Sequence, residues 1–201
     1  MINAVVFDLG NVLIEYQPLE YLKNTLGNEE NAELLYDTIF TSKEWLQLDE
    51  GTLVYRDATR IFQERVPELS QEIAMVMDDW HYHVYELTET TTLLKELKER
   101  GYTCYYLSNF QEHVYEYIKD KFSFWQYLDG GVFSFAEKLI KPDRRIYETL
   151  LKRFDLEASQ CVFMDDMEQN ILGARALGMH GIVFQDIGQV REELERMLAE
   201  K

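Results

Sequence analysis

Polar residues stand directly after several short apolar runs, where a buried strand would otherwise continue. These runs and their polar residues are INAVVF (2–7) with Asp8, YTCYYL (102–107) with Ser108-Asn109, and CVFM (161–164) with Asp165-Asp166. In a sheet of parallel strands, ligands bind at the carboxyl ends of the strands. One such residue alone usually caps a turn or a helix, but capping explains the joint pattern poorly. We therefore expect these side chains to meet at one edge of a sheet.

Three of these side chains are carboxylates, and together they predict a metal site. Asp8, Asp165 and Asp166 offer only oxygen ligands, which suit a hard cation such as Mg²⁺ that keeps several waters. Lys141, just before Pro142, adds one positive charge to the set. A metal at this position would screen the carboxylates from an anionic substrate, which Coulomb repulsion would otherwise exclude.

The charge of the whole chain limits its partners. The formal net charge is −17, from 37 acidic and 20 basic residues. Such a field repels nucleic acid and anionic membranes, so we expect neither as a partner. It also repels a phosphate ester, so any phosphate site must be made locally positive by a metal, a lysine or helix N-termini.

The elements that must position these residues alternate between strand and helix. Apolar patterning predicts strands at 2–7, 102–107, 161–164 and 181–184, and a loop or short strand at 129–135. It predicts helices at 89–100, 111–121, 142–154, 168–177 and 188–199. This alternation is typical of an α/β fold, here a Rossmann-like parallel sheet with helices on both faces.

A block of purely helical spacing interrupts this alternation after the first strand. Its breaks fall at Gly27-Asn28, Thr41-Ser42, Asp49-Glu50-Gly51 and Pro67, which indicates roughly four short helices. We interpret residues 17–83 as a small helical bundle that caps the core, and residues 1–16 and 84–201 as the core domain.

Three further features bear on compartment and assembly. The N-terminus lacks a basic segment followed by a long apolar stretch, and no run approaches a membrane span in length. Cys104 and Cys161 lie in apolar runs, which predicts buried, reduced thiols. We therefore expect a cytoplasmic protein, and a monomer or weak homodimer.

Four blocks of sequence resemble, in order and spacing, the motifs of the haloacid dehalogenase-like (HAD) hydrolase superfamily. They are VVFDLGNVL (5–13), YYLSN (105–109), KPDRRIY (141–147) and VFMDDMEQNILGARALG (162–178). The resemblance covers the whole chain, because the helical insert sits where members with a C1 cap carry theirs. DLGNV is also similar to a bacterial subgroup that contains α-glucose-1-phosphate phosphatases. The function that this implies is Mg²⁺-dependent hydrolysis of a small phosphate monoester, and the substrate that we expect is a sugar phosphate such as glucose 1-phosphate.

The resemblance implies a role for each residue of these blocks. Asp8 is the nucleophile that forms an aspartyl-phosphate, and Lys141 bridges Asp8 and the phosphate. Asp166 is a direct Mg²⁺ ligand, while Asp165 acts through a metal-bound water or orients its neighbours. The backbone carbonyl of Gly10 is a further metal ligand.

Residues at the second strand end are expected to bind the phosphate. The Ser108 hydroxyl and the backbone N–H of Asn109 can donate to phosphate oxygens at a helix N-terminus. Asn170, four residues after Asp166, either braces this loop or is an ordinary exposed helix residue.

Gly10 departs from the family pattern, because most phosphatases of the superfamily carry there a second Asp that serves as general acid and base. One interpretation is a good leaving group, such as the anomeric oxygen of a sugar 1-phosphate, with Glu15 or a cap residue moving protons. A second is a metal-independent haloacid dehalogenase, whose halide needs no acid, although the pair Asp165-Asp166 argues against it. A third is a non-catalytic relative that binds a phosphate ligand.

The cap is expected to set the choice of substrate. Its entry near Glu15-Tyr16 and its turn at 49–52 can face the site, and Glu50 is a candidate to bind sugar hydroxyls. An ordinary link between helices explains this turn equally simply. Trp45 and Trp80 either pack the cap or stack on a sugar face.

Overall fold

A parallel sheet forms the centre of the larger lobe of this computed structural model, which describes residues 1–199. Its strands are β1 (Ala4–Phe7), β4 (Thr103–Ser108), β5 (Gly130–Phe133), β6 (Cys161–Asp165) and β7 (His180–Val183). Their order across the sheet is β5-β4-β1-β6-β7. The structure thus confirms the predicted parallel α/β core, and shows that 129–135 contains a strand.

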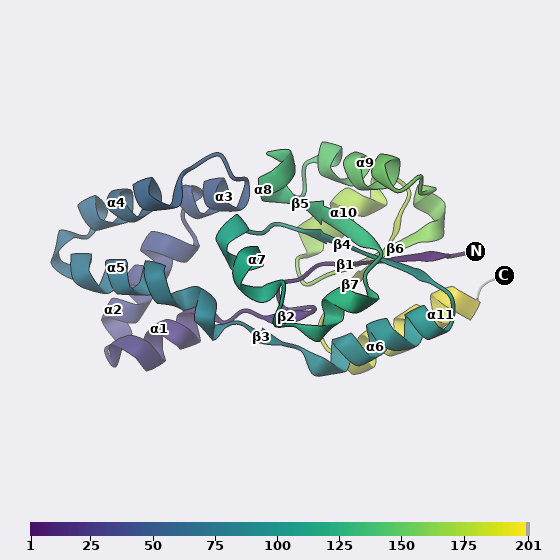
Figure 1. Cartoon of the computed structure of the whole chain (residues 1–201), viewed down its shortest axis with the longest axis horizontal. Helices are drawn as coiled ribbons and strands as arrows, with labels where there is room; N and C mark the ends of the chain where they lie inside the picture. The colour runs from purple at the N-terminus through teal and green to yellow at the C-terminus, as the bar shows by residue number, and fades with distance from the viewer. Residues whose placement is uncertain (200–201) are drawn as a thin grey trace.

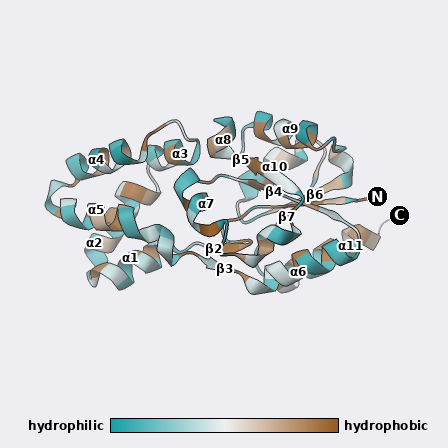
Figure 2. Ribbon diagram, in the orientation of Figure 1, coloured by the Kyte–Doolittle hydropathy of each residue, from teal (hydrophilic) through white to brown (hydrophobic). Residues whose placement is uncertain are grey.

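Helices cover both faces of this sheet (Figure 1). They are α6 (Thr88–Glu99), α7 (Glu112–Ile118), α8 (Ser134–Glu137), α9 (Arg144–Arg153), α10 (Glu168–Arg175) and α11 (Ile187–Ala199). Side chains alternate along a strand, so Val5 and Phe7 pack in one hydrophobic cluster and Ala4 and Val6 in another. Figure 2 shows hydrophobic residues along the central strands and mixed faces on the helices. Burial on both faces explains why β1 reads as a continuous apolar run.

The smaller lobe is the helical cap (Figure 1, purple to blue). It contains α1 (Pro18–Leu26), α2 (Glu29–Leu35), α3 (Lys43–Asp49), α4 (Tyr55–Arg65) and α5 (Ser70–Asp79). The sequence breaks act as caps: Asn28 Oδ1 accepts from Asn31 N at 3.0 Å, and Ser42 Oγ accepts from Trp45 N at 3.1 Å. The cap therefore has one more α-helix in its described residues than the sequence indicated.

A two-stranded antiparallel ribbon joins the two lobes. It pairs β2 (Ile14–Glu15) with β3 (Tyr85–Glu86), and Leu87 N continues the pairing by donating to Leu13 O at 2.9 Å. The sequence did not predict this ribbon, because two-residue strands show no periodicity. The division of the chain into two domains stays our interpretation.

Two other sequence features have a structural counterpart. Cys104 on β4 and Cys161 on β6 are both buried, and neither forms a disulfide with a residue of the described chain. Among the helices described, none combines the length and the apolar character that crossing a bilayer requires.

Aromatic rings fasten the cap to the core around His113 on α7. Its ring lies 4.3 Å from Tyr55, 5.9 Å from Trp80 and 5.3 Å from His81, measured between ring centroids. His113 Nε2 is buried, and no atom of the described residues hydrogen-bonds to it. Burial, reinforced by the charge of His81, lowers the pKa of His113 to about 4.

This environment predicts that acid loosens the cap. Because the pKa of His113 falls from 6.5 to about 4 on folding, its neutral ring stabilises the protein fully above pH 6.5. That contribution is lost as the pH falls toward 4. Urea unfolding at pH 7 and at pH 4.5 measures how much free energy of unfolding each protein loses on acidification. His113→Phe should lose about 1–2 kcal/mol less than wild type does. Exposed His180→Phe is the control, and an equal loss in all three proteins would contradict the argument.

Candidate active site

Three carboxyl groups meet at the carboxyl edge of the sheet. Asp8 follows β1, Asp165 ends β6 and Asp166 comes next in the chain. One oxygen from each lies within 4.8 Å of the others. The register of the sheet brings them together, because β1 and β6 are neighbours and Asp8 N donates to Met164 O at 2.9 Å.

Lys141 bridges two of these carboxylates in the interior. Its Nζ lies 2.9 Å from Asp8 Oδ1 and 2.6 Å from Asp165 Oδ2, and the residue is only 3% exposed. Asn109 fixes the Lys141 backbone, since Asn109 Nδ2 donates to Lys141 O at 3.2 Å and Lys141 N donates to Asn109 Oδ1 at 2.8 Å. Burial alone would lower the pKa of Lys141, but the two carboxylates outweigh it and raise the pKa.

One lysine does not balance three carboxylates. Burial raises the pKa of Asp8 to about 7, and the charge of Asp165 adds to the rise, while Lys141 and the Ser108 hydroxyl oppose it. Burial also raises the pKa of Asp166. Oxygen donors with excess negative charge fit a hard divalent cation, which would neutralise that charge.

The two acids at the end of β6 differ in their partners. Asn170 Nδ2 donates to both oxygens of Asp165, at 3.0 and 3.1 Å, so Asn170 is a buried brace rather than a surface residue. Asp166 Oδ2 accepts from Asn11 Nδ2 at 3.0 Å. Among the described residues, no donor hydrogen-bonds to Asp166 Oδ1. Asp166 can therefore offer an oxygen to a metal, while Asp165 is held between Lys141 and Asn170.

Asn11 is a site residue that the sequence pattern did not single out. Its φ of 53° lies in the left-handed region, where Asn is enriched among non-glycine residues. Besides its bond to Asp166, its Oδ1 accepts from Tyr16 N at 3.1 Å, which ties the metal-binding edge to the cap entry. The sequence signal that could have identified this residue is an Asn directly after Gly10, in the turn that follows the first strand.

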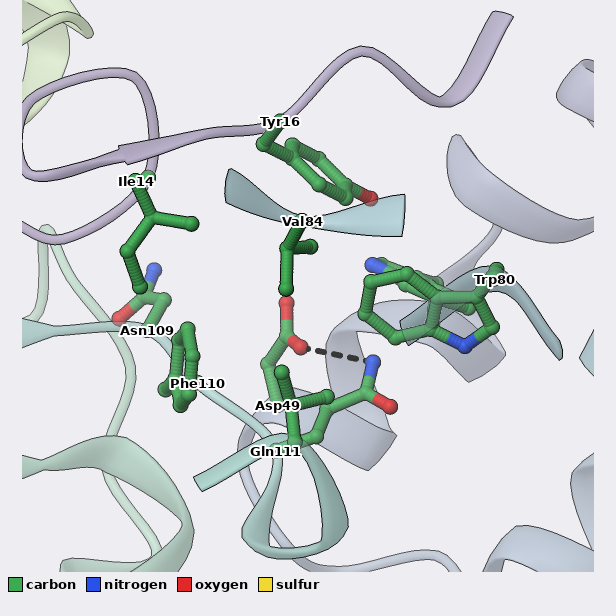
Figure 3. A pocket seen from close by; sticks show the side chains of 11 residues that line it. Ile14, Tyr16, Asp49, Trp80, Val84, Asn109, Phe110 and Gln111 are labelled. Carbon is green, nitrogen blue, oxygen red and sulfur yellow. Dashed lines mark hydrogen bonds between the residues drawn. The ribbon is translucent and has the colours of Figure 1, made fainter. Parts of the chain in front are cut away.

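A mainly apolar pocket lies between the two lobes (Figure 3). Its apolar lining includes Ile14, Tyr16, Trp45, Trp80, Val84 and Phe110. Its polar lining is Gly10 backbone, Asp49, Asn109 and Gln111. Trp45 and Trp80 pack against each other with ring centroids 4.9 Å apart, so they both build the cap and form a wall of the pocket.

Four predicted binding residues do not line this pocket: Lys141, which is buried with the carboxylates, and Ser108, Glu15 and Glu50. The three carboxylates of the acidic cluster do not line it either. Ser108 is buried at the end of β4, where its hydroxyl lies against Asp8. Glu15 is exposed and borders a separate hollow. The Glu50 carboxylate accepts from Thr52 Oγ1 at 3.0 Å. The immediate sequence neighbours of the two glutamates, Tyr16 and Asp49, line the pocket instead.

The buried bridge predicts a stability effect. Lys141→Met should destabilise the metal-free protein by about 3–5 kcal/mol, because it leaves buried carboxylates without their counter-charge. Adding Asp165→Asn should recover part of that loss. Urea unfolding in a chelating buffer measures both, and exposed Lys95→Met is the control. If Lys141→Met and Lys95→Met have the same free energy of unfolding, the bridge does not contribute to the stability of the fold.

Comparison with known proteins agrees with this geometry. The chain is 27% identical over 196 residues to the sesquiterpene phosphatase astK of Aspergillus oryzae, covering 98% of this chain and 96% of that protein. It is 25% identical to the ribulose-1,5-bisphosphate 5-phosphatase of Halopiger xanaduensis, covering 92% and 85%. A magnesium complex of a HAD family enzyme from Bacteroides thetaiotaomicron has a similar fold, with a TM-score of 0.75, 22% identity, and 97% and 98% coverage.

The family model for haloacid dehalogenase-like hydrolases matches residues 2–178. This match covers every residue of the acidic cluster and the lysine bridge, and it confirms the resemblance seen in the four sequence blocks. The chain belongs to the haloacid dehalogenase-like hydrolase family.

Proposed function

We propose that this hydrolase is a Mg²⁺-dependent phosphatase that cleaves a small phosphate monoester through an aspartyl-phosphate on Asp8. One observation carries the proposal: three carboxylate oxygens lie within 4.8 Å of one another, and one buried lysine bridges two of the three groups. A divalent cation would balance this charge and make the site attractive to a phosphate. Asp8, Asp166 and the Gly10 carbonyl would hold Mg²⁺, which supplies positive charge against the phosphate oxygens.

The contacts of Asp8 suit a nucleophile. Its Oδ1 accepts from Lys141 Nζ at 2.9 Å and from Leu9 N at 2.7 Å, so that oxygen is fixed. Among the described residues, no backbone or lysine donor holds the second oxygen, Oδ2, which would attack phosphorus while the bond from phosphorus to the alcohol oxygen breaks. Water then attacks the aspartyl-phosphate, which releases phosphate and restores Asp8. Ser108, the Asn109 N–H and Lys141 would bind the phosphate oxygens.

The pocket favours an apolar leaving group. Ile14, Val84 and Phe110, with the two tryptophans, offer a sugar few hydrogen-bond partners. The similarity to a sesquiterpene phosphatase supports the same choice, because that relative acts on a hydrocarbon-rich ester.

A sugar 1-phosphate such as glucose 1-phosphate is the second candidate. Gly10 favours it, because an anomeric oxygen leaves more easily than an ordinary alcohol when no acid stands at this position. A metal-independent dehalogenase would have no use for the paired acids Asp165-Asp166, and a binding-only relative would have no use for a free Asp8 oxygen.

The reaction class can be tested directly. Wild-type protein should release phosphate from 4-nitrophenyl phosphate only with Mg²⁺, and Asp8→Asn should lower the rate roughly 10³–10⁶-fold. Asp166→Asn should raise the Mg²⁺ concentration needed. Asp120→Asn, an exposed aspartate on the core, is the control. Halide release without metal would instead identify a dehalogenase, and bound phosphate without turnover would identify a binding protein.

The leaving group can be tested with a panel. We expect kcat/KM to be about tenfold or more higher for benzyl phosphate than for glucose 6-phosphate, because burial of the ring in the pocket is worth roughly 1–3 kcal/mol. If α-glucose 1-phosphate exceeds both esters, the second candidate holds. If it is no better than glucose 6-phosphate, leaving-group acidity does not explain Gly10.

A further inference from the structure

The turn that follows α3 of the cap is fastened to the core by three core side chains. Gln111 Nε2 donates to Asp49 Oδ1 at 2.9 Å, the Ser134 hydroxyl donates to the Asp49 carbonyl, and Lys138 Nζ donates to Gly51 O at 2.6 Å. The fit is close, since a Cβ on Gly51 would lie 2.7 Å from Phe135 O. The turn is therefore held in one position against the core.

These contacts direct the Asp49 carboxyl into the pocket. Figure 3 shows it between Asn109 and Phe110 on one side and Trp80 on the other, with its bond to Gln111 drawn. Oδ1 is the oxygen bonded to Gln111, and no donor of the described residues hydrogen-bonds to Oδ2. Gly10 and Asn109, at the ends of β1 and β4, line the same pocket. Asp49 thus shares one pocket with residues from the two strand ends that carry Asp8 and Ser108.

The core has room for a side chain at Gly10, the position at which most phosphatases of the superfamily carry a second Asp. A Cβ built on Gly10 has no other atom within 4 Å, so packing does not require glycine there. The pocket beside Gly10 is open toward the cap, and Asp49 is the acid that lines it among the described residues.

We propose that Asp49 is the general acid and base of this phosphatase, supplied by the cap in place of the side chain that Gly10 lacks. This inference rests on the proposed function. In the first step, Asp8 forms a bond to phosphorus, the bond from phosphorus to the alkoxide oxygen breaks, and protonated Asp49 gives its proton to that oxygen. In the second step, Asp49 takes a proton from water as the water oxygen attacks phosphorus, and the bond to Asp8 breaks. The products are the alcohol and phosphate, and Asp49 is protonated again.

The surroundings of Asp49 suit both steps. Burial raises the pKa of Asp49 to about 7, while the hydrogen bond from Gln111 and the charge of Lys141 oppose the rise. Tyr16 also faces this carboxyl, and burial together with the Asp49 charge keeps the Tyr16 hydroxyl protonated by raising its pKa. A carboxyl that titrates near neutrality can serve as donor and acceptor in turn.

The experiment uses two esters of nearly the same shape. The leaving group of 4-nitrophenyl phosphate departs without a proton, whereas that of 4-nitrobenzyl phosphate needs one. With Mg²⁺ present, Asp49→Asn should lower kcat/KM for the benzyl ester about 10²–10⁴-fold and for the phenyl ester less than tenfold. Because the second step then lacks its base, the phenyl ester should also give a burst of nitrophenol that matches the enzyme concentration.

Matched variants separate this role from anchoring of the cap. Asp37→Asn makes the same change at an exposed cap residue and should leave both esters unaffected. Gln111→Leu removes the anchoring bond but keeps the acid. It should therefore reduce kcat/KM for the benzyl ester less than Asp49→Asn does, and it should give no burst with the phenyl ester. Asp49→Ser keeps an oxygen for Gln111 but cannot exchange a proton near neutral pH. It should therefore repeat the effect of Asp49→Asn.

Two results for Asp49→Asn would overturn the inference. One is an equal loss of kcat/KM on both esters without a burst, in a variant that melts like wild type. The other is no loss of kcat/KM on either ester. If Asp49→Asn does not fold, Asp49→Ser decides in the same way. Failure of the proposed function looks different, because wild type would then cleave neither ester with Mg²⁺, or Asp8→Asn would retain the wild-type rate.

Discussion

The buried contact of Lys141 with Asp8 and Asp165 is the constraint on which the site depends. It joins the end of β1, the end of β6 and the loop before α9, which are far apart in the chain. A lysine and two carboxylates are tolerated in the interior only because they neutralise one another. Asp166 adds a further negative charge, which an additional cation would balance. In a chain of net charge −17, this local demand for positive charge is what makes a phosphate site physically reasonable.

The pocket combines two environments that follow from the two lobes. The sheet edge supplies polar groups, because parallel strands end there with free backbone groups and short polar side chains. The cap supplies Trp45 and Trp80, whose rings also form the cap interior. The phosphate of an ester would therefore lie against the core, and its organic part against the cap. Selectivity for the organic part then follows from residues that the cap needs for its own folding.

Most of the fold and the charged part of the site could be predicted from sequence, because both depend on local pattern. Asp8 and Asp165 stand at strand ends that apolar runs mark, and a parallel sheet forces such ends to one edge. Lys141 stands in the loop before α9, and its sequence signal is the resemblance of the KPDRRIY block. The pocket could not be predicted in the same way. Whether Glu50 or Asp49 faces it depends on how the cap docks, which is set by contacts such as Gln111 with Asp49, 62 residues apart. No periodicity encodes a contact of that range.

An acid on the cap behaves differently from one on the core. A carboxyl at position 10 would stand beside the phosphate in every state of the protein. Asp49 lines the pocket in an arrangement in which its turn is hydrogen-bonded to Ser134 and Lys138 of the core. Under the role proposed for Asp49, proton transfer therefore depends on these contacts between the lobes, and a substrate that breaks them would be bound but not protonated. The apolar pocket then contributes to discrimination twice, through binding of the leaving group and through the position of the acid.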